Sequence, residues 1–444
     1  MKYNEKLSNV AVLGAAGKMG SGIVLLTAVE MANNCFAEGK STDEVSLHAI
    51  DVSAPALGGL MKYLRSQILK NAEKITVQLR KWYATNPKLI ENEDVINQYV
   101  NDVLSLVKPT TRIEAAYDAQ LVFEAVSENP EVKVKLFSSI NQNNPYNPWF
   151  LSNTSSIPIN ELDEKAGLNG NIIGFHFYNP PAVQKLMEII PSKNTNQELF
   201  DFAEKLAKNL KKTIVFSNDM AGFIGNGFFM RDIIYAVSEV QKLSNQMSFI
   251  EALYVVDKVS RDFLIRPMGI FQLSDYVGID VCLFIMKVMD ERFSGETLQS
   301  QVLSGFMELG IKGGQFADGS QKDGIFKYTK GQITEIFDLE AKQYIDIKPV
   351  AESGDKFIGD MPPDWQPWKN IIKIRSREET LKQYFNGLKN MDTKGAKLAV
   401  SYAQKAGEIG KKLVNDGVAH STDDVNTVMT TGFFHAYGPV NNYL

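Results

Sequence analysis

The chain has 444 residues, 44% of them hydrophobic, and a formal net charge of −5. This length predicts two or three globular domains with a sizeable core, and the charge gives no reason to expect a nucleic-acid partner. Cys35 and Cys282 are far apart, each in an apolar run, so we expect buried thiols in a reducing compartment. The sequence shows no signal peptide and no apolar run of membrane-spanning length. We therefore expect a cytoplasmic protein without a membrane partner.

A strand, a glycine-rich turn and a helix are predicted near the start of the chain. The apolar run 9–13 leads into Gly14-Ala-Ala-Gly17-Lys-Met-Gly20, and an apolar helical segment follows from Ser21. Glycines in such a turn let the backbone approach a pyrophosphate, which lies at the helix N-terminus. The pattern indicates a dinucleotide-binding βαβ unit, although its G-x-x-G-x-x-G spacing has one residue more than the usual motif.

The second predicted strand, 46–50, ends at Asp51. An acidic residue at this position accepts hydrogen bonds from the adenosine ribose and repels a 2′-phosphate, which favours NAD over NADP. The distance from the last glycine to Asp51 is longer than usual. We therefore interpret the polar stretch from Met31 to Glu44 as an inserted loop, and we expect His48, inside the strand, to be structural.

Residues 57 to 107 combine helical periodicity with many charges. This predicts a long helical excursion, and an antiparallel pair of helices is one arrangement that fits it. Two interpretations stay open. The segment is either a solvated helical arm or a flap over a large substrate.

The chain has only four histidines, and His176 has the surroundings of a general base. Ser155 lies 21 residues before it and Glu188 lies 12 residues after it. A histidine takes a proton near neutral pH, a carboxylate stabilises the imidazolium, and a hydroxyl positions the reacting oxygen. Strands are predicted at 119–124, 149–152 and 171–175, so we expect Ser155 and His176 to follow strand ends, where ligands bind in such sheets. A structural histidine is the alternative.

Six segments of the chain match those of a known enzyme family in the same order. It resembles the L-3-hydroxyacyl-CoA dehydrogenases, including the dehydrogenase part of multifunctional fatty-acid oxidation proteins. The matching segments are 12–23, 122–135, 152–156, 176–188, 222–226 and 266–280. The resemblance implies an α/β fold, with a Rossmann-type dinucleotide-binding domain followed by all-α C-terminal helical domains. It implies NAD-dependent oxidation of an L-3-hydroxyacyl-CoA to the 3-ketoacyl-CoA, in fatty-acid β-oxidation or related acyl-CoA metabolism.

The resemblance also implies residue roles. His176 would be the general base and Glu188 its partner, Ser155 would bind the reacting oxygen, and Asn226 would face the acyl carbonyl side. Asn179 would support the geometry of the site, and no metal is implied. The residues implied along the cofactor are Gly14, Gly17, Met19, Gly20, Asp51, Ala125, Glu128 and Lys133. The chain departs from the family in the longer glycine loop and at Ile270, where the family has a proline.

The chain is expected to divide into four parts. Residues 1–218 would form the NAD-binding domain with the helical insert at about 57–107, and 219–340 the first C-terminal helical domain. Residues 341–390 would be a connector, and 391–444 a second, degenerate helical copy. Asp257 and Asn426 each lie twelve residues before a glycine, Gly269 and Gly438, which favours a repeat. We expect the two copies to form an intrachain pseudo-dimer, with His420 and His435 structural or solvated.

Two other functions remain as alternatives. One is a non-catalytic NAD-binding or structural relative, and the set of Ser155, His176, Glu188 and Asn226 argues against it. The other is a dehydrogenase of a small free hydroxy acid, which would not need a CoA-binding arm. The helical insert therefore argues against this second alternative.

Overall fold

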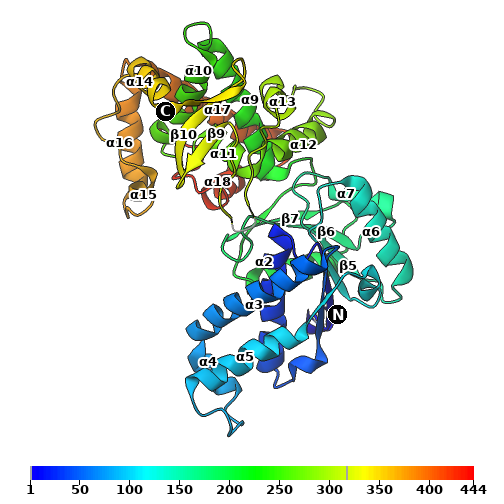
Figure 1. Cartoon of the computed structure of the whole chain (residues 1–444). Coiled ribbons are helices and arrows are strands. Elements are labelled where there is room, and N and C mark those ends of the chain that lie inside the picture. Colours follow the sequence, from blue (N-terminus) through cyan, green and yellow to red (C-terminus); the bar gives the residue numbers. More distant parts are fainter. Residues whose placement is uncertain (1–2, 317–318) are drawn as a thin grey trace. The chain divides into compact units, whose positions relative to one another are not determined.

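The computed structural model describes residues 3–316 and 319–444, and the chain divides into two compact units, Met1–Asp219 and Met220–Leu444 (Figure 1). The first unit is built around a mixed sheet with helices, and the second is mainly helical. The predicted fold class, a Rossmann-type domain followed by a helical C-terminal region, is confirmed.

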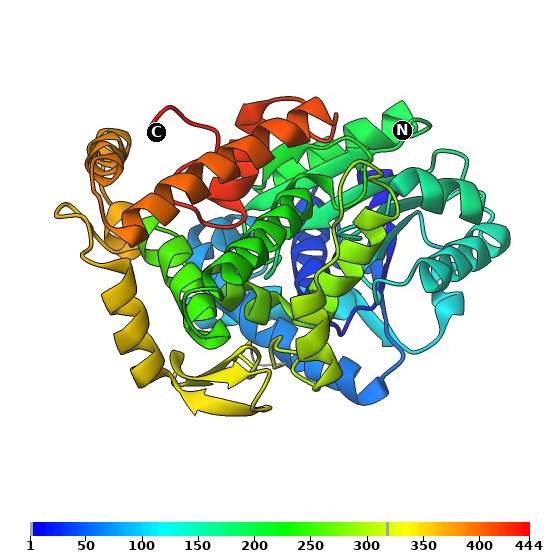
Figure 2. The same ribbon diagram turned by 90° about the horizontal axis from the view of Figure 1, so that it is seen from above.

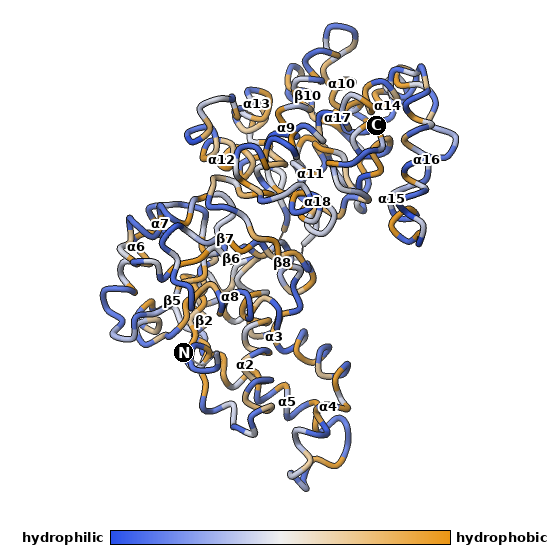
Figure 3. Tube along the Cα trace, turned by 180° about the vertical axis from the view of Figure 1, so that it is seen from behind, coloured by the Kyte–Doolittle hydropathy of each residue, from blue (hydrophilic) through white to orange (hydrophobic). Residues whose placement is uncertain are grey.

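An eight-stranded sheet forms the centre of the first unit, in the order β3-β2-β1-β4-β5-β6-β7-β8. Only the pair β6 and β7 is antiparallel. Strands β4 to β6 are fully buried, as short apolar runs predict, and Figure 3 draws much of the sheet in the orange of hydrophobic residues. The strand order reverses between β1 and β4, which is where such sheets bind a dinucleotide. The strands are β1 (Asn9–Leu13), β2 (Ser46–Ile50), β3 (Val107–Thr110), β4 (Leu121–Glu124), β5 (Trp149–Ser152), β6 (Ile172–Phe177), β7 (Leu186–Pro191) and β8 (Thr213–Phe216).

Helix α2 (Lys18–Ala37) corrects one expectation. The stretch from Met31 to Glu44 is not an inserted loop, because its first half continues this helix and a 3₁₀ turn occupies Thr42–Glu44. Met31, Ala32 and Cys35 are buried at helical spacing among polar residues. Packing of these three side chains against the core explains why the helix continues through them. The other helices next to the sheet are α1 (Tyr3–Lys6), α6 (Pro130–Asn143), α7 (Ile159–Ala166) and α8 (Gln197–Asn209).

Three helices make up the excursion between β2 and β3: α3 (Ala54–Lys74), α4 (Thr76–Trp82) and α5 (Asn92–Leu106). Helices α3 and α5 pack against each other and against α2 (Figure 1). Buried side chains on α3 and α5 join the core of the sheet domain, and the Tyr99 hydroxyl donates to Asn33 Oδ1 at 2.9 Å. One face of this excursion is therefore a packed layer of the first unit.

The second unit consists of helices around one hydrophobic core and a small antiparallel sheet of order β11-β10-β9. The sheet was not predicted, and the stretch 341–390 holds a strand and three helices with buried side chains. The elements are α9 (Phe223–Leu243), α10 (Phe249–Lys258), a π-helical turn (Val259–Phe263), α11 (Ile270–Val277), α12 (Ile279–Asp290), α13 (Gln301–Glu308), β9 (Phe326–Thr329), β10 (Gln332–Asp338), β11 (Gln343–Asp346), α14 (Ile347–Ile358), α15 (Trp368–Ile371), α16 (Arg377–Lys389), α17 (Lys394–Asn415) and α18 (Thr422–Thr431).

Two stretches of the second unit share an unusual local geometry. An ideal Cβ on Gly269 would lie 2.2 Å from Asp257 Cγ, and one on Gly438 would lie 2.2 Å from Asn426 Cγ. Four residues before each glycine stands a residue with positive φ, Ile265 at 50° and Phe434 at 57°. We propose on these matches that residues 391–444 are a degenerate second copy of the helical motif.

The proposed copies share a core. Helices α9 and α17 lie side by side (Figure 2). Arg266 Nη1 donates to Asp232 Oδ2 at 2.7 Å, and the Arg266 guanidinium lies 5.2 Å from the centre of the Tyr402 ring on α17. These groups are almost fully buried, so each copy covers polar and apolar surface of the other.

Asp257→Asn is expected to change how stability depends on pH. Asp257 Oδ1 accepts the backbone N–H groups of Phe271 and Gln272, at 2.9 and 3.0 Å, and an amide oxygen can do the same, as Asn426 does for Val440. Burial raises the pKa of Asp257 from 3.8 to about 6. The native chain therefore loses up to about 3 kcal/mol of stability as the pH rises from about 4 through about 6.

The variant should lack this loss and be more stable than the parent at about pH 8, with the difference vanishing near pH 4. Denaturant unfolding at both pH values measures it, with the exposed Asp364→Asn as control. Equal pH dependence in parent and Asp257→Asn would contradict the prediction.

Among residues 3–316 and 319–444, no helix combines the length and apolar composition needed to cross a membrane.

Candidate active site

His176 lies within a strand, as the fifth residue of β6, so the expectation that it follows a strand end is wrong. Strand β6 continues to Phe177 because it pairs with the antiparallel β7, in which Glu188 stands directly opposite His176. Directly opposite residues of an antiparallel pair lie on the same face of the sheet. His176 Nδ1 is 3.1 Å from Glu188 Oε2. The 12 residues that separate His176 from Glu188 in the sequence are thus spanned by the hairpin of β6 and β7.

Glu188 is fully buried and has a second partner. The Tyr178 hydroxyl donates to Glu188 Oε2 at 2.8 Å, and the rings of Tyr178 and His176 are 4.8 Å apart. Burial and the neighbouring Glu188 raise the pKa of Tyr178 well above its usual value, so this phenol stays a donor. The carboxylate is therefore oriented by two side chains of one motif. The sequence analysis did not single out Tyr178, although it lies within the His-Phe-Tyr-Asn segment.

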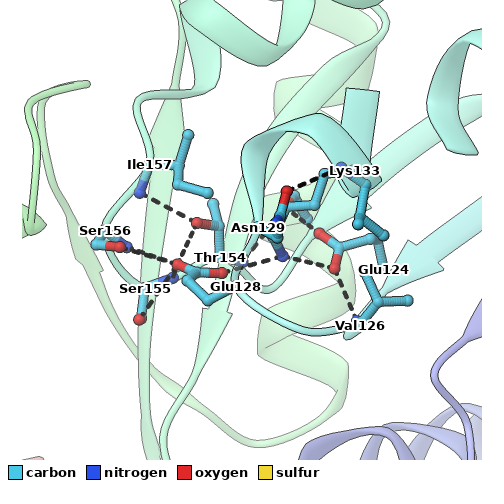
Figure 4. A network of polar contacts seen from close by, with 11 residues as sticks. Glu124, Val126, Glu128, Asn129, Lys133, Thr154, Ser155, Ser156 and Ile157 are labelled. Carbon is cyan, nitrogen blue, oxygen red and sulfur yellow. Dashed lines mark hydrogen bonds and ion pairs between the residues drawn. The ribbon is translucent and has the colours of Figure 1, made fainter. Parts of the chain in front are cut away.

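Residues 153–156, called the serine turn below, follow β5 and are held from one side by Glu128 (Figure 4). Glu128 Oε1 accepts the Thr154 hydroxyl at 2.6 Å and the backbone N–H groups of Ser155 and Ser156, at 2.8 and 3.1 Å. Asn153 Oδ1 accepts the backbone N–H of Phe177 at 2.8 Å, which ties the turn to the strand that carries His176. Ser155 and His176 therefore belong to adjoining segments, which this hydrogen bond joins.

Lys133 lies behind this turn. Its Nζ is 2.6 Å from Glu124 Oε1 and 3.0 Å from Glu128 Oε2. Burial alone would lower the pKa of Lys133, but the two carboxylates outweigh it and raise that pKa. Burial likewise opposes ionisation of Glu128, yet Lys133 and the donors of the turn lower the pKa of Glu128. Lys133 and Glu128 are therefore both held in their charged forms.

The glycine turn fits the pyrophosphate of NAD. Gly14 has a φ of +72°, and an ideal Cβ there would lie 2.5 Å from the carbonyl oxygen of Ala125. A Cβ on Gly20 would lie 2.0 Å from the carbonyl oxygen of Gly14, so neither position admits a side chain. The turn leads through Gly17 into α2, which begins at Lys18 with Met19 next to it. A helix N-terminus beside a close-packed glycine turn is suited to bind a pyrophosphate.

Asp51 stands at the end of β2 and faces this turn. Its Oδ2 accepts the backbone N–H of Ala16 at 3.0 Å, and its Oδ1 accepts that of Ser53 at 3.1 Å. The longer glycine loop thus bonds to the acidic residue expected to bind the ribose. Since a carboxylate has further lone pairs, these two bonds leave capacity for ribose hydroxyls. The residues present therefore fit NAD.

Comparisons with known proteins agree with this geometry. Residues 9–220 match the model of the 3-hydroxyacyl-CoA dehydrogenase NAD binding domain, and residues 222–322 match that of the C-terminal domain of the same enzymes. The chain belongs to the 3-hydroxyacyl-CoA dehydrogenase family. It is an NAD-dependent oxidoreductase, and the resemblance inferred from the sequence is confirmed.

Individual relatives align with this chain over most of their own length. A probable 3-hydroxybutyryl-CoA dehydrogenase of Bacillus subtilis is 30% identical over 64% of this chain and 86% of its own. The mitochondrial hydroxyacyl-coenzyme A dehydrogenase of Sus scrofa is 30% identical over 49% of this chain and 68% of its own. The crystal structure of 3-hydroxybutyryl-CoA dehydrogenase from Escherichia coli K12 covers 98% of this chain and 90% of its own, with a TM-score of 0.62 at 21% identity. The last comparison shows that this chain and the Escherichia coli enzyme share a fold over nearly the whole of this chain.

The remaining candidates of this dehydrogenase lie in two places. Asn179 follows β6 in the loop to β7, and Lys212 Nζ holds that loop by donating to the carbonyl oxygens of Pro181 and Gln184, at 2.5 and 2.7 Å. Asn226 belongs to the second unit, where it is the fourth residue of α9. Sequence reasoning did not identify Asn153 or Glu124 as site residues, although both lie within the matched segments.

Proposed function

We propose that this dehydrogenase oxidises an L-3-hydroxyacyl-CoA to the 3-ketoacyl-CoA with His176 as the general base. The observation that carries the proposal is the 3.1 Å contact between His176 Nδ1 and the buried Glu188. A carboxylate at Nδ1 favours the tautomer with a proton on Nδ1, which leaves Nε2 free of a proton and able to accept one from the substrate hydroxyl.

In this proposal each residue of the site has a separate role. When bound at the glycine turn, NAD supplies the hydride acceptor for C3 of the substrate. His176 Nε2 takes the hydroxyl proton, and Glu188 stabilises the resulting imidazolium across a short distance in a buried setting. The Ser155 hydroxyl orients the substrate oxygen. In the reverse direction the imidazolium of His176 returns the proton to the ketone oxygen.

The proposed substrate is a CoA thioester, and Asn226 is the residue we assign to its acyl carbonyl side. We place the reaction in fatty-acid β-oxidation or related acyl-CoA metabolism. This assignment rests on the family and on the residue set Ser155, His176, Glu188 and Asn226.

Formation of NADH from 3-hydroxyacyl-CoA thioesters of short, medium and long acyl chains tests the proposal. Free 3-hydroxy acids of the same lengths serve as controls. We expect turnover with at least one class of L-3-hydroxyacyl-CoA and little with the free acids. Equal rates with thioesters and free acids would instead assign the chain to small hydroxy acids.

A further inference from the structure

A turn at the end of α8 fixes the backbone of Lys212. Lys211 has a left-handed φ of 57°, and its backbone N–H donates to the carbonyl oxygen of Lys208 at 2.9 Å. The backbone N–H of Lys212 donates to the carbonyl oxygen of Ala207 at 3.0 Å. Two such bonds end a helix by satisfying its last carbonyl groups. Strand β8 begins at the next residue, Thr213, so Lys212 is held between a helix and a strand.

The side chain of Lys212 reaches the loop that joins β6 to β7, residues 178–185. Its Nζ donates to the carbonyl oxygens of Pro181 and Gln184, at 2.5 and 2.7 Å. The loop connects the strand of the proposed general base to the strand of its carboxylate partner. Lys212 therefore binds the turn of the hairpin on which both groups stand.

The same loop also contacts helix α2. An ideal Cβ on Gly22 would lie 2.9 to 3.1 Å from three side-chain atoms of Pro181, so a larger residue at position 22 would push Pro181 away. Gly22 is the fifth residue of α2, which begins directly after the glycine turn suited to a pyrophosphate. The loop is therefore held by Lys212 and by the helix at whose N-terminus the cofactor binds.

The two carbonyl oxygens need a donor with the properties of an ammonium group. An ammonium has three donors and no acceptor, so one Nζ can serve both oxygens, and bonds from a charged donor are roughly twice as strong as neutral ones. The Lys212 ammonium also lies 5.5 Å from the centre of the Phe177 ring. Burial lowers the pKa of Lys212 to about 8, so the fold holds this cation against a cost of desolvation. An apolar side chain of similar length would fill the space but leave both oxygens without this donor.

We propose that Lys212 is a positioning residue, which holds the loop between β6 and β7 against α2 and so fixes the strand of His176 relative to the helix that binds NAD. The inference rests on the proposed function of His176. The reaction removes a proton from a hydroxyl and a hydride from the carbon that bears it, so base and cofactor have to face one carbon atom together. A shift of the loop would change their relative placement without removing a group that touches the substrate.

Lys212→Met and Lys212→Arg test the proposal. Methionine removes every donor but keeps much of the length of the side chain, whereas a guanidinium keeps the charge and enough donors for both carbonyl oxygens. Lys211→Met, at the adjacent exposed lysine, is the matched control. The kcat and KM for the best acyl-CoA substrate, the Kd for NADH and the thermal midpoint are measured for each variant.

We expect the kcat of Lys212→Met to fall about 10- to 100-fold, since small misplacements of reacting groups cost up to about 10² in rate. Its KM and its Kd for NADH should stay within about threefold of the parent, because no group that touches substrate or cofactor is removed. Lys212→Arg should keep kcat within about fivefold of the parent, since it restores a charged donor for each oxygen. Lys211→Met should match the parent throughout.

Other results would overturn the proposal. A rise in KM or in the Kd for NADH as large as the loss of kcat would make Lys212 a binding residue. Failure of Lys212→Met to fold, or its full turnover, would leave the lysine a structural role only. If Lys212→Arg folded and were as slow as Lys212→Met, the paired donors would not be what the loop requires.

The parent and His176→Gln separate this inference from the proposed function. If the parent does not turn over any 3-hydroxyacyl-CoA, or if His176→Gln is as active as the parent, the proposed function is wrong. If the parent is active, His176→Gln is inactive and the Lys212 variants behave otherwise than expected, only the positioning role is wrong.

Discussion

His176→Gln is expected to fold and to bind NAD but to lose turnover by about 10²- to 10⁴-fold, the usual effect of removing a general base. Glutamine keeps much of the size of the imidazole but does not accept a proton near neutral pH. The strand pairing that holds position 176 depends on backbone hydrogen bonds and not on the side chain. Turnover of acetoacetyl-CoA with NADH measures the loss, and binding of NADH measures the intact cofactor site.

Glu188→Gln is expected to act in the same direction, because an amide keeps the size of the carboxylate but not the charge that stabilises the imidazolium. His48→Gln in β2 is the matched control, since it replaces a partly buried histidine of the same sheet. Near-parental turnover in His176→Gln would remove His176 from the mechanism. A comparable loss in His48→Gln would show that the substitution damages the sheet instead.

Deletion of residues 391–444 is expected to expose an apolar face and to give aggregation or a new dimer. The deleted segment contains Tyr402, Leu413 and Val428, all 0% exposed. A fully buried large apolar side chain contributes about 1.5–3 kcal/mol, so the loss of several is comparable with the whole stability of a domain, about 5–15 kcal/mol. Homo-oligomers with twofold symmetry cover such a face with the same surface of a second subunit.

Size-exclusion chromatography with light scattering reports the assembly of the truncated chain, and thermal unfolding reports its stability. The expected result is a dimer or larger species with a lower midpoint than the full chain. A truncated chain that stayed monomeric and as heat-stable as the parent would show that residues 391–444 do not complete the helical core.

The sequence alone determined the features that depend on neighbours along the chain. The apolar runs at 9–13 and 46–50 are strands with those bounds, because short runs of this composition between turn residues pair within a sheet. The glycines of the first turn indicated a dinucleotide, since the positive φ of Gly14 and the close backbone contacts at Gly14 and Gly20 are local requirements. Six ordered segments identified the family, which the comparisons confirm.

Only the tertiary structure decided what depends on residues far apart in the sequence. The sequence predicted that the strand 171–175 ends before His176, whereas pairing with β7 extends β6 through His176 and places Glu188 opposite it. Burial against the core made the first half of the Met31–Glu44 stretch part of helix α2, although its polar composition suggested a loop. The sequence did not identify Glu124 as a site residue, because its role also depends on contacts between different elements. Its partners Ser152 and Lys133 come from β5 and α6, and only the packed fold brings them to one carboxylate.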